Sequence, residues 1–374
     1  MERRGPVWRD ADVFVVGGGP AGLAAAIAAA ARGLRVIVAD GANPPIAKAC
    51  GEGLLPNAVA ALAEMGIVLG EEAGCALRGI LFEDETGSVG AKFPCGHRIG
   101  MRRETLHQLM IDRASDCGVS LMWNTPVTAL FEDGVLAGGN KVRARWTVGA
   151  DGIGSRVRSW IGLESRRAPR NRFAFRQHYR LKPWTEFIEI HWSDLAQAYV
   201  TPVGPEDICV VMISSDSSRR FEKGILGFPK LMLRLSDAPP SSSERGAVTS
   251  MFELKRTFRE NVALIGDASG SVDAITGEGL ALSFQQARVL ADALVAGDLG
   301  QYQEAHRRLA RRPRFMGNLL LLLARQSGIR ERTLRTLGSS PALYERMLAY
   351  HVGEANTLQL ATTGANFGWR FLTA

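Results

Sequence analysis

A chain of 374 residues, 46% of them hydrophobic and 22% charged, is long enough for two domains with sizeable cores and has the composition of an ordinary soluble protein. Its cysteines are odd in number, widely scattered and free of any Cys-x-x-Cys pair, which argues against a disulfide framework and a structural zinc site. We therefore expect no metal and a reducing, cytoplasmic compartment. The cysteines are Cys50, Cys75, Cys95, Cys117 and Cys209.

The charge balance is basic, with a net charge of +7 and an isoelectric point of about 9.4. Basic patches bind nucleic acids or anionic lipids, but no nucleic-acid-binding module is recognisable, so we expect no nucleic-acid partner. A ligand that carries a pyrophosphate is also favoured by positive charge. The arginines gather mainly in residues 166–180, 307–314 and 325–335.

The first predicted elements are a strand, a glycine-rich turn and a helix. Residues 13–16 form an apolar, β-branched run, and Gly17, Gly19 and Gly22 follow at the G-x-G-x-x-G spacing. Gly17 allows a tight turn, Gly19 lets a pyrophosphate approach the backbone, and Gly22 lets the helix pack closely on the strand. The pattern predicts the phosphate site of a dinucleotide.

The helix after this turn supplies the rest of that site. It begins at Pro20 and Ala21, where free N–H groups and the positive end of the helix dipole face the phosphates. A second strand, residues 34–39, ends at Asp40, 18 residues after the last glycine of the motif, and an acid there suits a pair of ribose hydroxyls. The glycines and the proline inside residues 13–31 argue against a transmembrane or signal segment.

The remaining elements follow from periodicity and turn residues. A β-hairpin is predicted over residues 77–99, a helix over 103–117 and a strand over 119–123. Alternation in the next strands predicts a sheet with one polar or ligand-facing side, and the chain is largely helical from residue 301. The predicted strands are 127–131, 135–137, 143–148, 172–181, 187–192, 197–203, 207–213 and 262–265; residues 237–243 are a loop, and a long helix starts near Gly279.

Two further motifs decide which class of protein the chain resembles. One runs from Val148 to Arg158, and the other runs from Leu264 to Leu280. With all three motifs in this order, the chain resembles the flavoprotein superfamily of aromatic hydroxylases, geranylgeranyl reductases and flavin-dependent halogenases, and among these the bacterial FAD-dependent monooxygenase-like proteins. The resemblance covers most of the chain and implies FAD, bound in an extended conformation.

The resemblance also implies the fold class. We expect an α/β protein with a Rossmann-like FAD-binding domain of the glutathione-reductase type, interrupted by a β-rich substrate domain and followed by a C-terminal helical segment. The expected limits are residues 1–75, 100–170 and 250–300 for the FAD-binding domain, 76–99 and 171–249 for the substrate domain, and 301–374 for the helical region.

Several cofactor contacts are implied by matching this family's motifs. Asp267 matches the aspartate that binds the ribityl or ribose hydroxyls near the pyrophosphate. The turn formed by Gly277, Glu278, Gly279 and Leu280 matches the one that aims a helix N-terminus at the flavin O2 and N1, where the dipole stabilises the anionic reduced flavin.

Four other residues complete the implied cofactor site. Asp151 and Gly152 match the motif near the pyrophosphate, and the backbone of Val127 matches the position that meets adenine. Arg103 matches an arginine on the FAD phosphates or ribose, with Arg102 as the neighbouring alternative. Structural readings stay open as well: Asp267 as a helix cap, Asp151 as a turn former and Arg103 as a solvated arginine at the start of a helix.

The loop around Cys50 bears on the subfamily. Cys50-Gly51-Glu52-Gly53 resembles the Cys-Gly-Gly loop of the geranylgeranyl reductases, which lies against the flavin, and the Gly-Glu-Ser-Leu-Leu-Pro loop of the phenolic halogenases. The halogenase Trp-x-Trp-x-Ile-Pro motif is absent, which argues against that group. We predict four catalytic residues on the substrate side, namely Cys50, Glu52, His178 and Tyr199.

Structural readings also stay open, with Cys50 as an inert thiol, His178 as a satisfied sheet histidine and Tyr199 as core or pocket wall. His191 and Trp192 are further candidates to face the substrate. Arg176, His178 and Arg180 fall on one side of a strand of period two, where they would orient a phenolate.

The function favoured by these patterns is hydroxylation of an apolar aromatic or polyketide-like substrate by an FAD-dependent monooxygenase, through a flavin C4a-hydroperoxide. Saturation of isoprenoid double bonds, as in the geranylgeranyl reductases, is the first alternative, and a flavin-binding protein without turnover is the second. Because only one G-x-G-x-x-G is present, the reductant NAD(P)H visits the flavin transiently or a partner reductase donates electrons.

The leucine-rich run of residues 319–324 is too short to span a bilayer and lies near several arginines. It predicts a buried helix with a solvated basic flank, or else loose contact with a membrane surface that holds a small lipophilic substrate. The oligomeric state is not indicated by the sequence.

Overall fold

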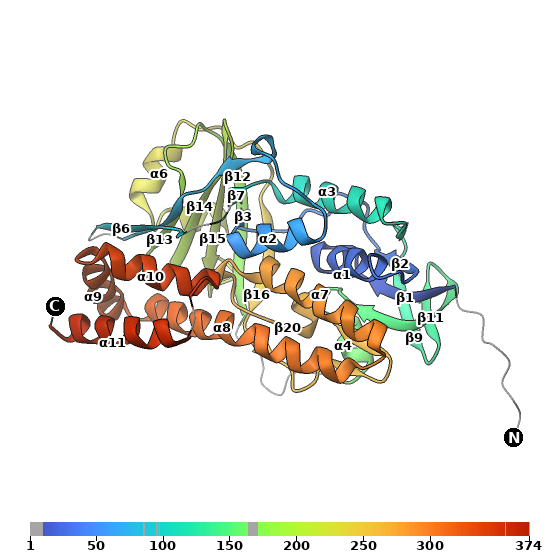
Figure 1. Cartoon of the computed structure of the whole chain (residues 1–374). Helices are drawn as coiled ribbons and strands as arrows, with labels where there is room; N and C mark the ends of the chain where they lie inside the picture. Colours follow the sequence, from blue (N-terminus) through green and yellow to red (C-terminus); the bar gives the residue numbers. More distant parts are fainter. Residues whose placement is uncertain are drawn as a thin grey trace, which may run out of the picture.

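The computed structural model describes residues 10–84, 87–94, 96, 98–163, 171–355 and 357–373. Cys95 and residues 166–170 of the first arginine cluster, both named above, lie outside this part of the chain. The described elements form two large sheets and a C-terminal group of helices (Figure 1). The limits of the three predicted domains stay a prediction.

The first sheet is the Rossmann-like one, with the order β18-β19-β11-β1-β2-β8. Its central strands run parallel because helices cross over between them, and their apolar runs are buried on both faces. Strands β9 and β10 extend β11 as the predicted meander. The strands are β1 (Ala11–Val16), β2 (Val36–Ala39), β8 (Ser120–Met122), β9 (Val127–Phe131), β10 (Gly134–Ala137), β11 (Asn140–Gly149), β18 (Phe258–Arg259) and β19 (Val262–Leu264).

Three helices cover this sheet, and their packing explains why the first of them is rich in alanine. Helix α1 (Pro20–Ala30) packs against α7 (Gly279–Ala296) and α3 (Arg103–Asp116). Its alanines are almost entirely buried, so their small side chains let α1 fit between its neighbours. The glycine-rich turn is thereby fixed at the carboxyl end of β1.

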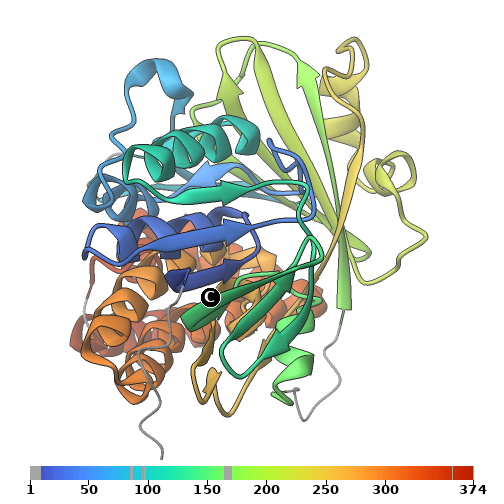
Figure 2. The same cartoon turned by 90° about the vertical axis from the view of Figure 1, so that its right-hand side faces the viewer.

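The second sheet has the order β16-β12-β15-β14-β13-β5-β6 (Figure 2). The predicted hairpin, β5 with β6, joins this sheet through a parallel pairing of β5 with β13. Strand β16 and the short helices α5 and α6 on the outer face were not predicted from the sequence. The elements are β5 (Gly79–Glu83), β6 (Ser88–Lys92), β12 (Asn171–Arg180), β13 (Phe187–Trp192), β14 (Ala196–Gly204), β15 (Asp207–Ser214), α5 (Phe221–Ile225), α6 (Pro229–Leu235) and β16 (Arg245–Ser250).

The C-terminal helices connect the two sheets. Helix α8 (Leu299–Arg325) runs from the first sheet toward the second, and α9 (Ser327–Gly338), α10 (Pro341–Val352) and α11 (Thr357–Thr373) follow (Figure 1). Leucines of α8, α9 and α10 share one core with the inner face of the second sheet. Within the described residues, no helix is long and apolar enough to cross a membrane.

Candidate functional site

A cavity of about 1180 Å³ extends from the carboxyl end of β1 to the C-terminal helices. At one end it is lined by the glycine-rich turn and by several acidic residues, among them Asp40 and Asp267. The inner face of the second sheet lines its middle, and apolar side chains of α8 to α11 line the far end. We call these parts the cofactor end and the apolar end.

The glycine-rich turn has the geometry that the motif predicts. Gly17 has a φ of +108°, and a Cβ there would lie 2.6 Å from the Ala150 carbonyl oxygen. A Cβ on Gly22 would overlap the Gly17 carbonyl, which accounts for the close packing of α1, although Gly22 itself does not line the cavity. A Cβ on Gly19 would meet nothing within 4 Å, so this backbone is open to a ligand.

His107 on α3 supports this turn, and the sequence analysis did not single it out. Its Nε2 lies 2.8 Å from the Gly18 carbonyl oxygen, and its Nδ1 accepts the Ile46 N–H at 3.1 Å. Nε2 therefore carries the proton and donates to Gly18. Burial lowers the pKa of His107, which keeps the ring neutral in this role.

The acid at the end of β2 also holds the turn. Asp40 Oδ2 accepts the Gly18 N–H and its Oδ1 accepts the Ala42 N–H, both at 2.8 Å. Each carboxylate oxygen keeps a second lone pair, and Asp40 lines the cavity, so it can still accept bonds from ribose hydroxyls. Val127 lines the cavity beside Pro126.

The two neighbouring arginines have different environments. Arg102 pairs with Asp207 at 3.1 Å and does not line the cavity. Arg103 lines it, and in the described structure its buried Nε has no hydrogen-bond partner. An unpaired buried guanidinium nitrogen is costly unless a ligand satisfies it, so Arg103 fits an anionic group such as a phosphate.

Asp151 has two functions in the structure. Its Oδ2 accepts the N–H groups of Arg156 and Val157 at 2.7 and 3.1 Å, at the start of α4 (Arg156–Trp160), whose N-cap residue is Ser155. Its buried Oδ1 has no partner among the described residues, while Asp151 and Gly152 line the cavity. This oxygen is available to a ligand.

Asp267 does not cap a helix. Its short helix has Ile265 at the N-cap and no side-chain cap bond. Asp267 Oδ2 instead lies 3.2 Å from Lys48 Nζ, and its Oδ1 accepts the Ser271 hydroxyl at 3.2 Å. Asp267 and Lys48 both line the cavity, so the carboxylate is placed to contact a ligand.

The turn before α7 is placed as expected except for one side chain. Gly277, Gly279 and Leu280 line the cavity, and Gly277 has a φ of +67°. Glu278 is fully buried away from it, because its carboxylate pairs with Arg312 at 2.7 Å and lies 3.7 Å from His351 Nδ1. The Glu278 side chain therefore anchors the C-terminal helices, and the role of the turn at the cofactor stays a prediction.

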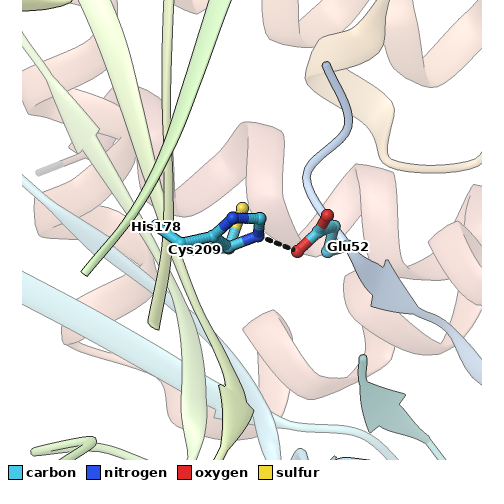
Figure 3. Close-up of side chains that lie close together, drawn as sticks. All are labelled: Glu52, His178 and Cys209. Carbon is cyan, nitrogen blue, oxygen red and sulfur yellow. Dashed lines mark hydrogen bonds and ion pairs between the residues drawn. The ribbon is translucent and has the colours of Figure 1, made fainter. Parts of the chain in front are cut away.

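Glu52 and His178 form a buried pair, of which Glu52 lines the cavity and His178 does not (Figure 3). Glu52 Oε2 lies 2.6 Å from His178 Nε2, and its Oε1 accepts the Arg103 N–H at 3.1 Å. Glu52 has a φ of +58°, a conformation that L residues rarely adopt and that concentrates at functional sites. Cys209, beside His178 on the paired strand, completes the group.

The partners of His178 fix its tautomer. Arg176 Nη1 lies 2.7 Å from His178 Nδ1, and a guanidinium can only donate. Nδ1 is therefore an acceptor, and the ring proton is on Nε2, where it is donated to Glu52. Ser242 Oγ is also 2.9 Å from Nδ1. The sequence offered no signal for Ser242, which lies in a segment assigned only as a loop.

The other predicted catalytic residues, Cys50 and Tyr199, have no charged side chain as a hydrogen-bond partner among the described residues. Cys50 lines the cavity, and its sulfur accepts the Glu52 N–H at 3.4 Å. Tyr199 also lines the cavity, but its hydroxyl donates a hydrogen bond to the Ile275 carbonyl at 3.3 Å. Burial raises the pKa of Tyr199 far above the usual value. Burial likewise raises the pKa of Cys209. Tyr199 and Cys209 are thus poor proton donors and nucleophiles at neutral pH.

Besides Arg176 and His178, three candidates do not line the cavity. His191 lies on the outer face of the second sheet, because it pairs with Glu189 at 3.0 Å and packs against Phe228, while Ile190 next to it lines the cavity. Trp192 packs on Phe82 instead of lining the cavity, and Arg180 is exposed. The expectation that these side chains face the substrate is corrected.

The comparisons with known proteins agree with this architecture. Residues 10–179 match the family model described as FAD binding domain. The chain is 29% identical to the menaquinone reductase of Mycolicibacterium smegmatis over 79% of both chains, and 24% identical to the digeranylgeranylglycerophospholipid reductase of Thermoplasma volcanium over 78% of this chain and 82% of that protein.

A solved structure shows the fold. The flavoprotein/dehydrogenase of Cytophaga hutchinsonii superposes with a TM-score of 0.79 at 18% identity and covers 91% of this chain and 92% of that one. The predicted resemblance and fold class are confirmed. The fold, the motif geometry and the match of residues 10–179 to the FAD binding domain are those of an FAD-dependent oxidoreductase.

Proposed function

We propose that this protein is an FAD-dependent reductase that saturates double bonds in the isoprenoid chain of a lipid. The observation that carries the proposal is the apolar end of the cavity. It is deep, continuous with the cofactor end and walled by four helices, which suits a long flexible hydrocarbon better than a single aromatic ring. Its lining includes Leu319, Leu320, Leu323, Ile329, Leu337, Leu348 and Phe367.

The relatives support the same substrate class. Menaquinone and digeranylgeranylglycerophospholipid, the compounds in the names of the two curated relatives, both carry isoprenoid chains. These relatives match about four-fifths of the chain, so the similarity extends beyond residues 10–179.

The residues at the cofactor end fit FAD. The open backbone at Gly19 and the unpaired Nε of Arg103 would hold the pyrophosphate, and Asp40 and Asp267 would accept bonds from hydroxyls of the ribose and ribityl chains. The N-terminus of α7, at Gly279, would face the flavin ring. When bound and reduced, FAD supplies a hydride.

Glu52 would supply the matching proton. An additional proton on the Glu52–His178 pair rests on Glu52, because His178 Nδ1 faces the Arg176 guanidinium and cannot hold one there. Glu52 lines the cavity, and its carboxyl group would protonate one alkene carbon while the other receives the hydride. The double bond becomes a single bond, and Glu52 is left as a carboxylate that is reprotonated from water.

The source of electrons is part of the proposal. We propose NAD(P)H or a partner reductase as the reductant, because the sequence contains one G-x-G-x-x-G and no second motif of this kind. Hydroxylation of an apolar aromatic remains the second candidate. It is supported by the three-motif resemblance, but it leaves the length of the apolar end without a use.

An isotope experiment separates these functions. FAD-loaded protein is incubated in the absence of oxygen with a quinone or glycerolipid that carries a geranylgeranyl chain. The reductant is NAD(P)H or a chemical reductant, and the mass of the product is measured by mass spectrometry. A gain of two hydrogens per reduced double bond supports the proposal. Product formed only in air, with oxygen from labelled dioxygen, would establish the hydroxylase instead. Protein that takes up no FAD would exclude both.

A further inference from the structure

The solvent face of α8 has an unusual composition for a surface helix. Residues at alternating spacings of three and four, which share one face of a helix, are all exposed. Phe315 is 50% and Leu322 is 40% exposed, and both lie between arginines along this face. The face consists of Arg308, Arg311, Phe315, Asn318, Leu322 and Arg325; we call it the α8 face.

The α8 face is also where the cavity meets the surface. Phe315 and Leu322 are exposed and yet line the cavity, so the apolar end opens through an apolar rim. Helix α11 bounds the same end with Phe367 and Phe371. A neighbouring residue of α11, Leu372, is 74% exposed. An opening for a water-soluble substrate does not need large apolar side chains in water.

The charge around this rim has one sign. Residues 305–330 contain no Asp or Glu. Arg308, Arg311 and Arg325 are exposed, and within the described part of the chain none of the three takes part in an ion pair or another recorded polar interaction. Exposed apolar side chains flanked by unpaired arginines are typical of helices that lie in the interface of an anionic bilayer.

We propose that the α8 face docks on an anionic phospholipid membrane, with Phe315 and Leu322 among the acyl chains and the flanking arginines on lipid phosphates. This proposal rests on the proposed function, since it gives the route of the isoprenoid lipid. The cavity mouth then faces the bilayer, and the chain of the substrate passes from lipid into the apolar end without crossing water. The occupant of the face is the lipid surface rather than a second protein.

Vesicle sedimentation tests the docking. Full-length, FAD-loaded protein is mixed with vesicles of phosphatidylcholine alone or with phosphatidylglycerol, at low and high salt. We expect binding to the anionic vesicles that is at least about tenfold stronger than to neutral ones and that weakens with salt. The double variant Arg308→Gln/Arg311→Gln should lose about tenfold or more of this affinity.

A matched control removes the same charge elsewhere. Arg180→Gln/Lys182→Gln alters two exposed cations at the end of β12, and it should bind vesicles as the unchanged protein does. Equal losses in both double variants, or equal binding to both vesicle types, would overturn the proposal. So would a concentration-dependent dimer, seen in sedimentation velocity, that Phe315→Ser/Leu322→Ser dissociates.

Reduction of a detergent-dispersed substrate keeps the two proposals apart. Arg308 and Arg311 do not line the cavity, so Arg308→Gln/Arg311→Gln should reduce a dispersed lipid at the unchanged rate and a vesicle-embedded lipid more slowly. Turnover in detergent without vesicle binding refutes the docking alone. Vesicle binding without turnover under either condition refutes the reductase function and leaves the docking supported.

Discussion

The two ends of the cavity are built in different ways. At the cofactor end, the geometry is set by backbone atoms and by charged side chains that are each fixed by particular hydrogen bonds, such as Asp40 on Gly18 and His107 on the same residue. At the apolar end, leucines and aromatic residues of four helices share contacts without direction. A substitution at the cofactor end should therefore abolish a specific interaction, whereas a substitution at the apolar end should change substrate binding gradually with the volume added or removed.

The largest effect is expected at the point where the two ends meet. In Glu52→Gln, the amide oxygen can still accept the Arg103 N–H, but the acidic proton is gone. We expect a loss of about 100- to 1,000-fold in double-bond reduction, with flavin reduction by NAD(P)H unchanged. Stopped-flow absorbance of the flavin and product analysis measure the two steps separately.

Tyr199→Phe is the matched control, because it removes a hydroxyl from the same wall that is bonded to the Ile275 carbonyl. It should slow reduction by less than about tenfold. Equal slowing of flavin reduction and product formation in Glu52→Gln would show that Glu52 positions the cofactor and is not the proton donor.

The next effect tests whether the cofactor end depends on open backbone. Gly19 has a φ of −71° and empty space where a Cβ would lie, so Gly19→Val should fold without strain. Its side chain would occupy the proposed phosphate position, and we expect FAD affinity to fall about 100-fold, or about 3 kcal/mol. Fluorescence titration of the apoprotein and chemical unfolding provide the two measurements.

Gly22→Ala serves as the contrasting variant. Its added methyl group overlaps the Gly17 carbonyl, so it should lower the free energy of unfolding as well. Full FAD retention in Gly19→Val would contradict the placement of the pyrophosphate.

The stability of the fold should depend on pH through His306, a buried histidine near the cofactor end. Burial lowers the pKa of His306 to about 4, from 6.5 for an unperturbed histidine, and its Nε2 lies 2.9 Å from Ser269 Oγ. Below about pH 6.5 the unfolded chain takes up a proton that the folded chain refuses until about pH 4, so stability falls as pH falls through this window. Between about pH 7 and about pH 5 the loss from this residue is about 2 kcal/mol.

Denaturant unfolding at the two pH values measures this loss. His306→Gln keeps a hydrogen-bonding group but does not titrate, and its free energy of unfolding should fall less over the same interval. A pH dependence as steep in His306→Gln as in the unchanged protein would show that other groups are responsible.

The smallest effect tests the graded character of the apolar end. Ile329 on α9 lines the cavity and is only partly buried, so a larger side chain can be accommodated there. In Ile329→Trp the cavity is shortened, so about two methylene groups of the longest isoprenoid chains can no longer be buried. We expect KM for these chains to rise about tenfold. Short-chain substrates should be unaffected. A uniform loss across chain lengths would contradict the position of the tail.

The sequence predicted those parts of the fold that are encoded locally. The G-x-G-x-x-G turn, the meander and the strands from 172 to 213 follow from short patterns, and all are found. Strand β16 was missed because Arg245-Gly-Ala-Val-Thr-Ser250 has little apolar alternation and is held mainly by pairing with β12. Helices α5 and α6 are too short for periodicity to reveal.

The sequence predicted individual residues of the site but not the contacts between them. Glu52 and His178 were both named, but their pairing joins segments 126 residues apart, and no local pattern encodes it. His191 was misplaced because alternation along a strand shows which residues share a face and leaves open which face is inward. The ion pairs of Glu278 were not predicted because its partners, Arg312 and His351, belong to helices far along the chain.

The anchoring of Glu278 has a consequence for engineering. Grafting a different set of C-terminal helices to change chain-length preference would remove Arg312 and His351, and the carboxylate at the head of α7 would then be enclosed without a counter-charge. A chimera that keeps these two positions should accept foreign helices, whereas one that discards them should lose its flavin along with its specificity.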